Sequence, residues 1–209
     1  MTSTTKAGSS SEPAFADSTE IWIVRHGETE WSLSGQHTGK TDIPLTENGE
    51  RQAAALRDML SRVEPVRVLS SPRARALETA RLGGIEVDET TEDLGEWDYG
   101  DYEGLTSPQI HETDPDWTVF VDGCPNGESV ADVSARADRV LAHIAGHLAD
   151  GPVMLFGHGH FSRVLGARWI GLPAAGGASL LLGTAAPSVL SAEHGTPALL
   201  RWNLPNPAA

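Results

Sequence analysis

The chain has 209 residues and a formal net charge of −14, which argues against nucleic acid or anionic membranes as partners because both bind basic surfaces. No apolar run approaches the ~18 residues that a membrane span needs. The single cysteine, Cys124, excludes an internal disulfide and fits a reducing, cytoplasmic compartment; we expect it to be a small buried side chain. Residues 1–18 are rich in Ser, Thr and Ala and predict a disordered tail, followed by a single domain over 19–209.

The first predicted element is a buried strand, Ile21-Trp22-Ile23-Val24, which is followed at once by Arg25, His26 and Gly27. Four consecutive apolar residues are typical of a strand that is covered on both faces. Open α/β sheets bind their ligands at the carboxyl ends of strands, so Arg25 and His26 predict an anion site. The alternative is a surface Arg-His pair at the end of a strand.

Helices and strands alternate along the rest of the chain, which predicts a largely parallel sheet covered on both faces. A loop at 31–45 precedes the first helix, and the last two strands form a hairpin. In chain order we expect helix 47–63, strand 66–69, helix 72–82, short helix 107–112, helix 128–149, strand 153–156, helix 161–171 and strands 188–191 and 198–202.

The second and third strands are also followed by candidate anion ligands. Arg75 lies in the first turn of a helix, where a cation is unfavourable by roughly 0.3–1 kcal/mol unless an anion binds there. His158 and His160 follow the third strand, and with His26 they suggest either a metal site or imidazoles around an anion. The arginines favour the anion, because they would repel a divalent metal. Converging at one sheet edge, these groups predict a phosphate pocket in which a neutral His26 can attack phosphorus.

Residues 92–104 interleave carboxylates with three aromatic side chains. A solvated acidic loop is the ordinary interpretation, but exposed loops rarely need aromatics. A carboxyl group held against aromatic rings can act as a proton donor, so we predict a functional acid in this loop. The residues alone do not choose among Glu96, Asp98, Asp101 and Glu103.

Together these motifs resemble the histidine phosphatase, or phosphoglycerate mutase-like, superfamily. Its Arg-His-Gly motif stands at 25–27 and its Ser-Pro-x-x-Arg-Ala element at 71–76. Its Glu-loop is similar to 94–104, and its second His-Gly to 158–159. The resemblance implies a three-layer α/β/α sandwich with a mostly parallel central sheet and a C-terminal hairpin, and it implies no metal and no cofactor.

The resemblance also implies roles for individual residues. His26 would be the nucleophile, and Glu96 the general acid for the leaving group and then the base for the attacking water. Arg25, Arg75 and His158 would bind and stabilise the transferring phosphoryl group. The predicted phosphate- and substrate-binding residues are Ser32, Thr38, Gly39, Tyr99 and Gly159.

Two departures from the family's mutases favour a phosphatase. Ser32 stands where the mutases have asparagine, and the run from Glu96 to Gly104 resembles acid phosphatases and sedoheptulose bisphosphatases instead. Residues 105–126, which in the family overhang the pocket, contain four carboxylates and no Lys or Arg. A mutase needs cations there for a second anion, although Lys40 or Arg163 could supply one.

We therefore predict hydrolysis of a small phosphate monoester, such as a sugar or polyol phosphate with a neutral remainder. Three alternatives stay open: a cofactor-dependent phosphoglycerate mutase, a sugar bisphosphatase, and a non-catalytic phosphate-binding module. The oligomeric state also stays open, with a homodimer as one option.

Overall fold

The structure is a computed structural model that describes residues 15–16 and 19–208. Most of the tail predicted at 1–18 therefore lies outside the described residues. Phe15 is described, and its ring centroid lies 4.7 Å from that of Trp169. No helix in the described part of the chain is long and apolar enough to cross a membrane.

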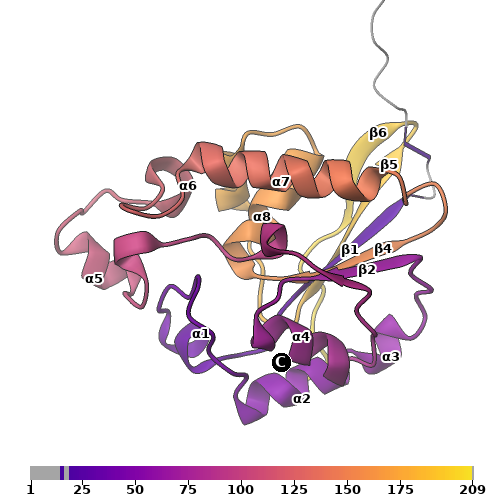
Figure 1. The fold of residues 1–209 in the computed structure, drawn as a ribbon, viewed down its shortest axis with the longest axis horizontal. Coiled ribbons are helices and arrows are strands. Elements are labelled where there is room, and N and C mark those ends of the chain that lie inside the picture. The colour runs from indigo at the N-terminus through magenta and orange to yellow at the C-terminus, as the bar shows by residue number, and fades with distance from the viewer. Residues whose placement is uncertain (1–14, 17–18, 209) are drawn as a thin grey trace, which may run out of the picture.

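Within the described residues, one six-stranded sheet with the order β3-β2-β4-β1-β5-β6 forms the centre of the molecule (Figure 1). Strands β3, β2, β4 and β1 run parallel, and β5 runs antiparallel to both β1 and β6. The mostly parallel sheet and the C-terminal hairpin are therefore confirmed. The strands are β1 (Glu20–Arg25), β2 (Arg67–Ser70), β3 (Glu89–Thr90), β4 (Val153–Gly157), β5 (Pro187–Glu193) and β6 (Thr196–Arg201).

Helices cover both faces of this sheet, which gives the predicted three layers (Figure 1). Helices α2, α3 and α4 lie on one face, and α7 and α8 lie on the other. Their bounds are α2 (Glu47–Ala55), α3 (Arg57–Leu60), α4 (Ala74–Leu82), α7 (Val130–Ala145) and α8 (Gly159–Trp169).

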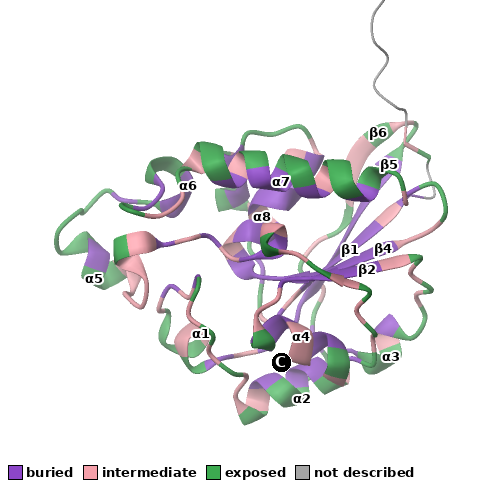
Figure 2. Ribbon diagram, in the orientation of Figure 1, coloured by how far each residue is buried: buried purple, intermediate pink, exposed green. Residues whose placement is uncertain are grey.

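Strand β1 is apolar throughout because its alternate side chains enter two separate cores. Ile21 and Ile23 pack in the core on the α7 and α8 side, whereas Trp22 and Val24 pack with residues of α3 and α4. None of the four is more than 7% exposed. Figure 2 shows the resulting band of buried residues along β1, β2 and β4 between the helical layers.

Several element boundaries differ from those predicted, and capping explains some of them. The predicted loop at 31–45 begins with a short helix, α1 (Glu30–Ser34). Thr29 and Ser32 form a capping box there, each side chain accepting a hydrogen bond from the backbone N–H of the other. Helix α7 starts after its cap, Ser129, and ends four residues before the predicted 149. Helix α8 starts at Gly159, which makes His158 its N-cap residue.

Other predicted segments contain finer structure. The predicted helix 47–63 is broken at Leu56 into α2 and α3. The acidic loop 92–104 contains two 3₁₀ turns, and a third follows α8. The remaining short elements are η1 (Glu92–Leu94), η2 (Gly100–Tyr102), α5 (Ser107–His111), α6 (Val119–Asp122) and η3 (Ala174–Ser179). Cys124 is buried as predicted, and burial raises the pKa of its thiol to about 12.

Register brings the predicted site segments to one edge of the sheet. Arg25 at the end of β1 pairs with Gly157 in β4, and Ser70 in β2 pairs with Phe156. The chain stays paired one residue further, because the His26 N–H donates to the Gly157 carbonyl at 3.0 Å. The carboxyl ends of three strands therefore lie side by side, as the sequence predicts.

Candidate active site

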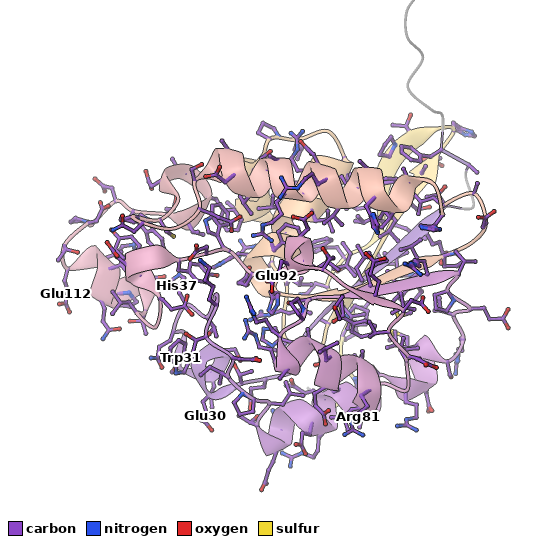
Figure 3. All side chains as sticks on the ribbon, viewed as in Figure 1. Glu30, Trp31, His37, Arg81, Glu92 and Glu112 are labelled. Carbon is purple, nitrogen blue, oxygen red and sulfur yellow. The ribbon has the colours of Figure 1, made fainter. Side chains whose placement is uncertain are left out.

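A pocket of about 250 Å³ opens at this edge of the sheet. Seven of the ten predicted site residues line it, and the other three, Gly39, Arg75 and His158, lie outside its lining. In Figure 3 the labelled His37 marks the side of the pocket near α1 and α5. The seven lining residues are Arg25, His26, Ser32, Thr38, Glu96, Tyr99 and Gly159.

His26 is a buried, neutral imidazole, and one of its ring nitrogens has no hydrogen-bond partner among the residues that the structure describes. Its Nδ1 lies 2.7 Å from the Gly27 carbonyl oxygen, which can only accept, so Nδ1 carries the proton. The pKa of His26 is well below its ordinary value, because burial disfavours the charged ring and Arg25 and Arg75 repel a further positive charge. Nε2 therefore keeps its lone pair, which is the state that a nucleophile needs.

Gly27 is required by the close approach of α2. A Cβ at this position would lie 2.5 Å from the Gly49 carbonyl oxygen. The Gly27 N–H donates to Thr79 Oγ1 at 3.0 Å, and the Thr79 hydroxyl donates in turn to the Arg75 carbonyl at 2.7 Å. These contacts fix the end of β1 against α2 and α4, and they hold His26 in place.

Arg25 lies along the start of α8 with donor capacity to spare. Its Nη1 donates to the Leu182 carbonyl at 2.6 Å, whereas its buried Nε has no partner among the described polar atoms. Burial lowers the pKa of Arg25, and the nearby Glu96 acts in the opposite direction. A Cβ at Gly159 would lie 3.2 Å from Arg25 Cζ, so the small residue lets the guanidinium lie against α8. The guanidinium suits an anion held at the sheet edge.

Arg75 and His158 form a fully buried pair beside His26. Because Arg75 only donates, its Nε–H must donate to His158 Nδ1, at 3.3 Å, and His158 Nε2–H then donates to Ser71 Oγ at 2.8 Å. The His158 and His26 ring centroids are 5.2 Å apart. Burial first, and then Arg75, holds the pKa of His158 well below its ordinary value. With both ring nitrogens occupied, His158 does not present a lone pair for a metal.

The guanidinium of Arg75 is fixed from the opposite side by the loop after α1. Its Nη1 donates to the Thr41 carbonyl at 2.8 Å, and its Nη2 donates to the Thr38 and Gly39 carbonyls, both at 3.1 Å. Thr38 and Gly39 thus hold the cation through their backbones. The Gly39 N–H is also engaged, because it donates to the Glu103 carboxylate. Arg75 adds its positive charge to the pocket from behind the wall.

Glu96 lies at the N-terminus of α8, on the pocket. Its carboxylate accepts hydrogen bonds from the backbone N–H groups of Trp97 at 2.9 Å, His160 at 3.0 Å and Phe161 at 2.8 Å. These bonds orient the carboxyl group. The other three candidate acids make different contacts. Asp98 pairs with Lys40 at 2.6 Å, Asp101 accepts a hydrogen bond from the Asn126 side chain at 2.9 Å, and Glu103 accepts backbone N–H groups. Trp97 and Tyr99 are buried, so the loop is not simply a solvated acidic segment.

Arg136 holds the Glu96 loop and is absent from the residues that the sequence predicts. Its guanidinium donates to the carbonyls of Asp93, Gly95 and Glu96 at 2.6 to 3.1 Å, and it pairs with Glu128 at 2.6 Å. A signal for it exists in the sequence. An arginine stands on the apolar face of α7, next to Ala137, where a buried charge needs partners.

The part of the pocket that was expected to contact the rest of the substrate is lined by other residues than those predicted. The hydroxyl of Ser32 is occupied in the capping box of α1. Of residues 105–126, only Ser107 lines the pocket, so the lack of cations in that segment says little about it. Arg163 of α8 lines the pocket instead, with its guanidinium 4.5 Å above the Phe120 ring centroid. His37 and His160 also line it. The sequence suggested His160 only as a possible ligand of the anion or of a metal, and it gave no signal for His37.

Comparison with known proteins gives the class to which this fold and site belong. The chain is a member of the histidine phosphatase superfamily, because the family model for branch 1 matches residues 21–205. The family resemblance read from the sequence is thereby confirmed.

Individual relatives and one solved structure show which members of this superfamily the chain is similar to. The chain is 47% identical to an acid phosphatase of Mycobacterium tuberculosis over 178 residues, which cover 84% of this chain and 87% of the relative. It is 36% identical to a sedoheptulose 1,7-bisphosphatase of Saccharomyces cerevisiae, over 72% of this chain and 67% of the relative. The solved structure of the Mycobacterium tuberculosis open reading frame Rv3214 superposes with a TM-score of 0.88 at 44% identity, covering 90% of this chain and 98% of that one. These phosphatase relatives are consistent with phosphomonoesterase activity.

Proposed function

We propose that this protein is a metal-independent phosphomonoesterase that hydrolyses small phosphate monoesters through a phosphohistidine on His26. One observation carries the proposal. His26 is a neutral imidazole with a free Nε2, and the charges of Arg25 and Arg75 act on its ring. Two fixed cations beside a nucleophile suit the negative charge of a transferring phosphoryl group.

The reaction has two steps. In the first, Nε2 of His26 attacks phosphorus, the N–P bond forms and the ester P–O bond breaks. The departing oxygen takes a proton from the Glu96 carboxyl group. In the second, Glu96 takes a proton from water as the water attacks phosphorus, and the N–P bond breaks. The products are an alcohol, inorganic phosphate and regenerated His26. The charges of Arg25 and Arg75 stabilise the phosphoryl group in both steps, and His158 contributes by accepting the hydrogen bond that holds the Arg75 guanidinium.

Substitution of His26 tests this proposal. The His26→Ala variant should lose roughly 10⁴-fold or more in kcat on an aryl phosphate, because no other group replaces the nucleophile. Circular dichroism and thermal unfolding verify that the variant folds. The control is His143→Ala, which removes a half-exposed imidazole on α7 outside the pocket. Turnover of the His26→Ala variant near the wild-type rate would refute the covalent mechanism.

For the substrate, the predicted small sugar or polyol monophosphate remains our proposal, and Arg163 supports a sugar bisphosphatase as the second candidate. The relative named sedoheptulose 1,7-bisphosphatase points the same way. A kinetic panel of sugar monophosphates and bisphosphates separates the two. A bisphosphate preference of more than about tenfold in kcat/KM (roughly 1.4 kcal/mol) that Arg163→Met abolishes would establish the second candidate. Bisphosphoglycerate-dependent isomerisation without phosphate release would establish a mutase instead.

We also propose that the protein works in the cytoplasm, as a single domain over 19–209, without nucleic acid, metal or cofactor. The net charge of −14 and the lone buried thiol support this setting. A homodimer is the candidate assembly that we propose to test against the monomer. Analytical ultracentrifugation with and without inorganic phosphate would distinguish the dimer from the monomer.

A further inference from the structure

Two histidines that the proposed mechanism does not use face the same pocket. The rings of His37 and His160 stack with their centroids 6.0 Å apart and an interplanar angle of 28°. Both residues line the pocket. Neither Nε2 has a hydrogen-bond partner in the described part of the chain, and neither is among the enclosed, unpartnered atoms there. Both Nε2 atoms are therefore accessible to a molecule in the pocket.

The tautomer of His37 is fixed by a backbone carbonyl. Its Nδ1 lies 2.7 Å from the oxygen of Leu105, which can only accept a hydrogen bond. Nδ1 must therefore carry the proton, and in the neutral ring Nε2 is an acceptor. Burial lowers the pKa of His37, which keeps the ring neutral near pH 7.

The tautomer of His160 is fixed by Tyr99 in the opposite sense. The buried Tyr99 hydroxyl lies 2.6 Å from His160 Nδ1 and has no other partner among the described residues. If Nδ1 were the donor, the phenolic proton would have no acceptor among the described residues, whereas a donating Tyr99 satisfies both groups within the protein. Tyr99 therefore donates, and the proton of His160 lies on Nε2. Burial raises the pKa of Tyr99 and lowers that of His160, so both groups stay neutral.

We propose that His37 and His160 form a hydroxyl-reading pair, which means that together they bind one hydroxyl group of the leaving alcohol. His37 Nε2 accepts a hydrogen bond from this hydroxyl group, and His160 Nε2–H donates one to it. A hydroxyl group both donates and accepts, so an acceptor beside a donor fits it better than it fits an apolar group or an anion. The preferred substrates are thus phosphate esters of polyhydroxylated alcohols. This proposal rests on the proposed phosphatase function and names the substrate class of the same site.

Nitrogen NMR tests the tautomers without any assay of activity. In ¹⁵N-labelled protein, long-range ¹H–¹⁵N correlation spectra should show His37 protonated on Nδ1 and His160 protonated on Nε2. The His37→Phe and His160→Phe variants assign the signals. Tyr99→Phe removes the hydrogen bond to His160 Nδ1, so the His160 signals should shift toward a mixture of tautomers. The same tautomer at both histidines in the wild type would overturn the pair.

A matched substrate series tests the recognition. The series is glycerol phosphate, the propanediol phosphates that each lack one hydroxyl, and propyl phosphate. The wild type should lose at least about tenfold in kcat/KM when the recognised hydroxyl is removed, because the pair is then left without its partner. In His37→Phe and His160→Phe the series should become flat, whereas the control His143→Phe should retain the wild-type discrimination.

The outcomes separate this inference from the proposed function. A flat series in a wild-type enzyme that is active on an aryl phosphate would overturn the hydroxyl-reading pair, as would a discrimination that both Phe variants retain. If either variant fails to fold, the discrimination that the wild type shows between the substrates of the series is the test. No phosphate release from any ester, aryl phosphate included, would instead defeat the proposed phosphatase function.

Discussion

The two ends of the pocket are built in different ways. The phosphate end consists of buried charged and imidazole side chains at the ends of β1 and β4 and in the first turn of α4, and they bond largely to one another and to backbone carbonyls. The leaving-group end is assembled from the loop after α1, the Glu96 loop and α8, and it presents neutral imidazoles with a single cation, Arg163. The sheet edge therefore supplies the charge that phosphoryl transfer needs, and the surrounding segments supply selection.

The largest expected effect at the phosphate end, after loss of the nucleophile, is that of Arg75→Met. Arg75 acts on the pocket by its charge, and loss of one preorganised group that stabilises developing negative charge typically lowers kcat by roughly 10²–10³-fold. The change also leaves the carbonyls of Thr38, Gly39 and Thr41 without their donor, so kcat should fall together with the melting temperature.

The matched control is Arg81→Met, an exposed cation on the same helix that pairs with Glu78 and with no other described carboxylate. Steady-state kinetics on an aryl phosphate and thermal unfolding measure both effects. If Arg75→Met lost less than about threefold in kcat, its charge would not be part of the phosphate end.

An intermediate effect is expected where the two ends meet, at Glu96. Glu96→Gln keeps the shape of the side chain but cannot deliver the proton of a carboxyl group. General acid catalysis typically contributes roughly 10²–10⁴-fold, so turnover of propyl phosphate should fall by that amount. A nitrophenyl phosphate should lose less, because its leaving group departs without a proton. Equal losses on the two esters would place the role of Glu96 elsewhere than in leaving-group protonation.

The smallest effect concerns stability against pH. The pKa values of His26 and His158 are both depressed in the folded protein, by burial first and then by the neighbouring arginines. Above about pH 6.5 both histidines are neutral in the folded and in the unfolded chain, so folding stability does not depend on their titration there and is at its full value. As the pH falls below that value, the unfolded chain binds protons that the folded chain does not bind. The free energy of unfolding therefore declines by up to about 1.4 kcal/mol per pH unit for each histidine.

Urea unfolding between neutral and mildly acidic pH measures this slope. The His158→Asn variant should show a shallower decline than the wild type, because one of the histidines with a depressed pKa, a group that also includes His37 and His160, is gone. A slope identical in wild type and variant would show that His158 does not carry a depressed pKa.

The phosphate end was largely predictable from the sequence, and the reason is local. Uninterrupted apolar runs identify buried strands, and Arg25, His26 and His158 follow such runs directly. The choice of Arg75 over Arg73, and of Glu96 over its neighbours, came from the family resemblance. Arg75 is fully buried in the structure, whereas Arg73 pairs with Glu92 on a more exposed surface; the roles of Arg75 and Glu96 stay predictions.

The leaving-group end was less predictable because its properties depend on distant partners. The acceptor on His37 exists because the carbonyl of Leu105, 68 residues away, occupies the other nitrogen. Likewise, Tyr99 and His160 are 61 residues apart. Arg163 was recognised as a source of charge, but its place on the pocket depends on which face α8 turns toward the site, and the apolar spacing did not reveal this. The prediction of a neutral substrate remainder relied on the segment 105–126, but of this segment only Ser107 lines the pocket.

The central claim is that phosphate passes through His26. Rapid-quench mixing of the enzyme with a ³²P-labelled monoester, followed by denaturation in alkali, tests it most directly. If phosphate passes through His26, a protein-bound label should survive alkali, be released by acid, map to His26 and be absent from His26→Ala. An enzyme that turns over with no such label, or with the label on another residue, would contradict it.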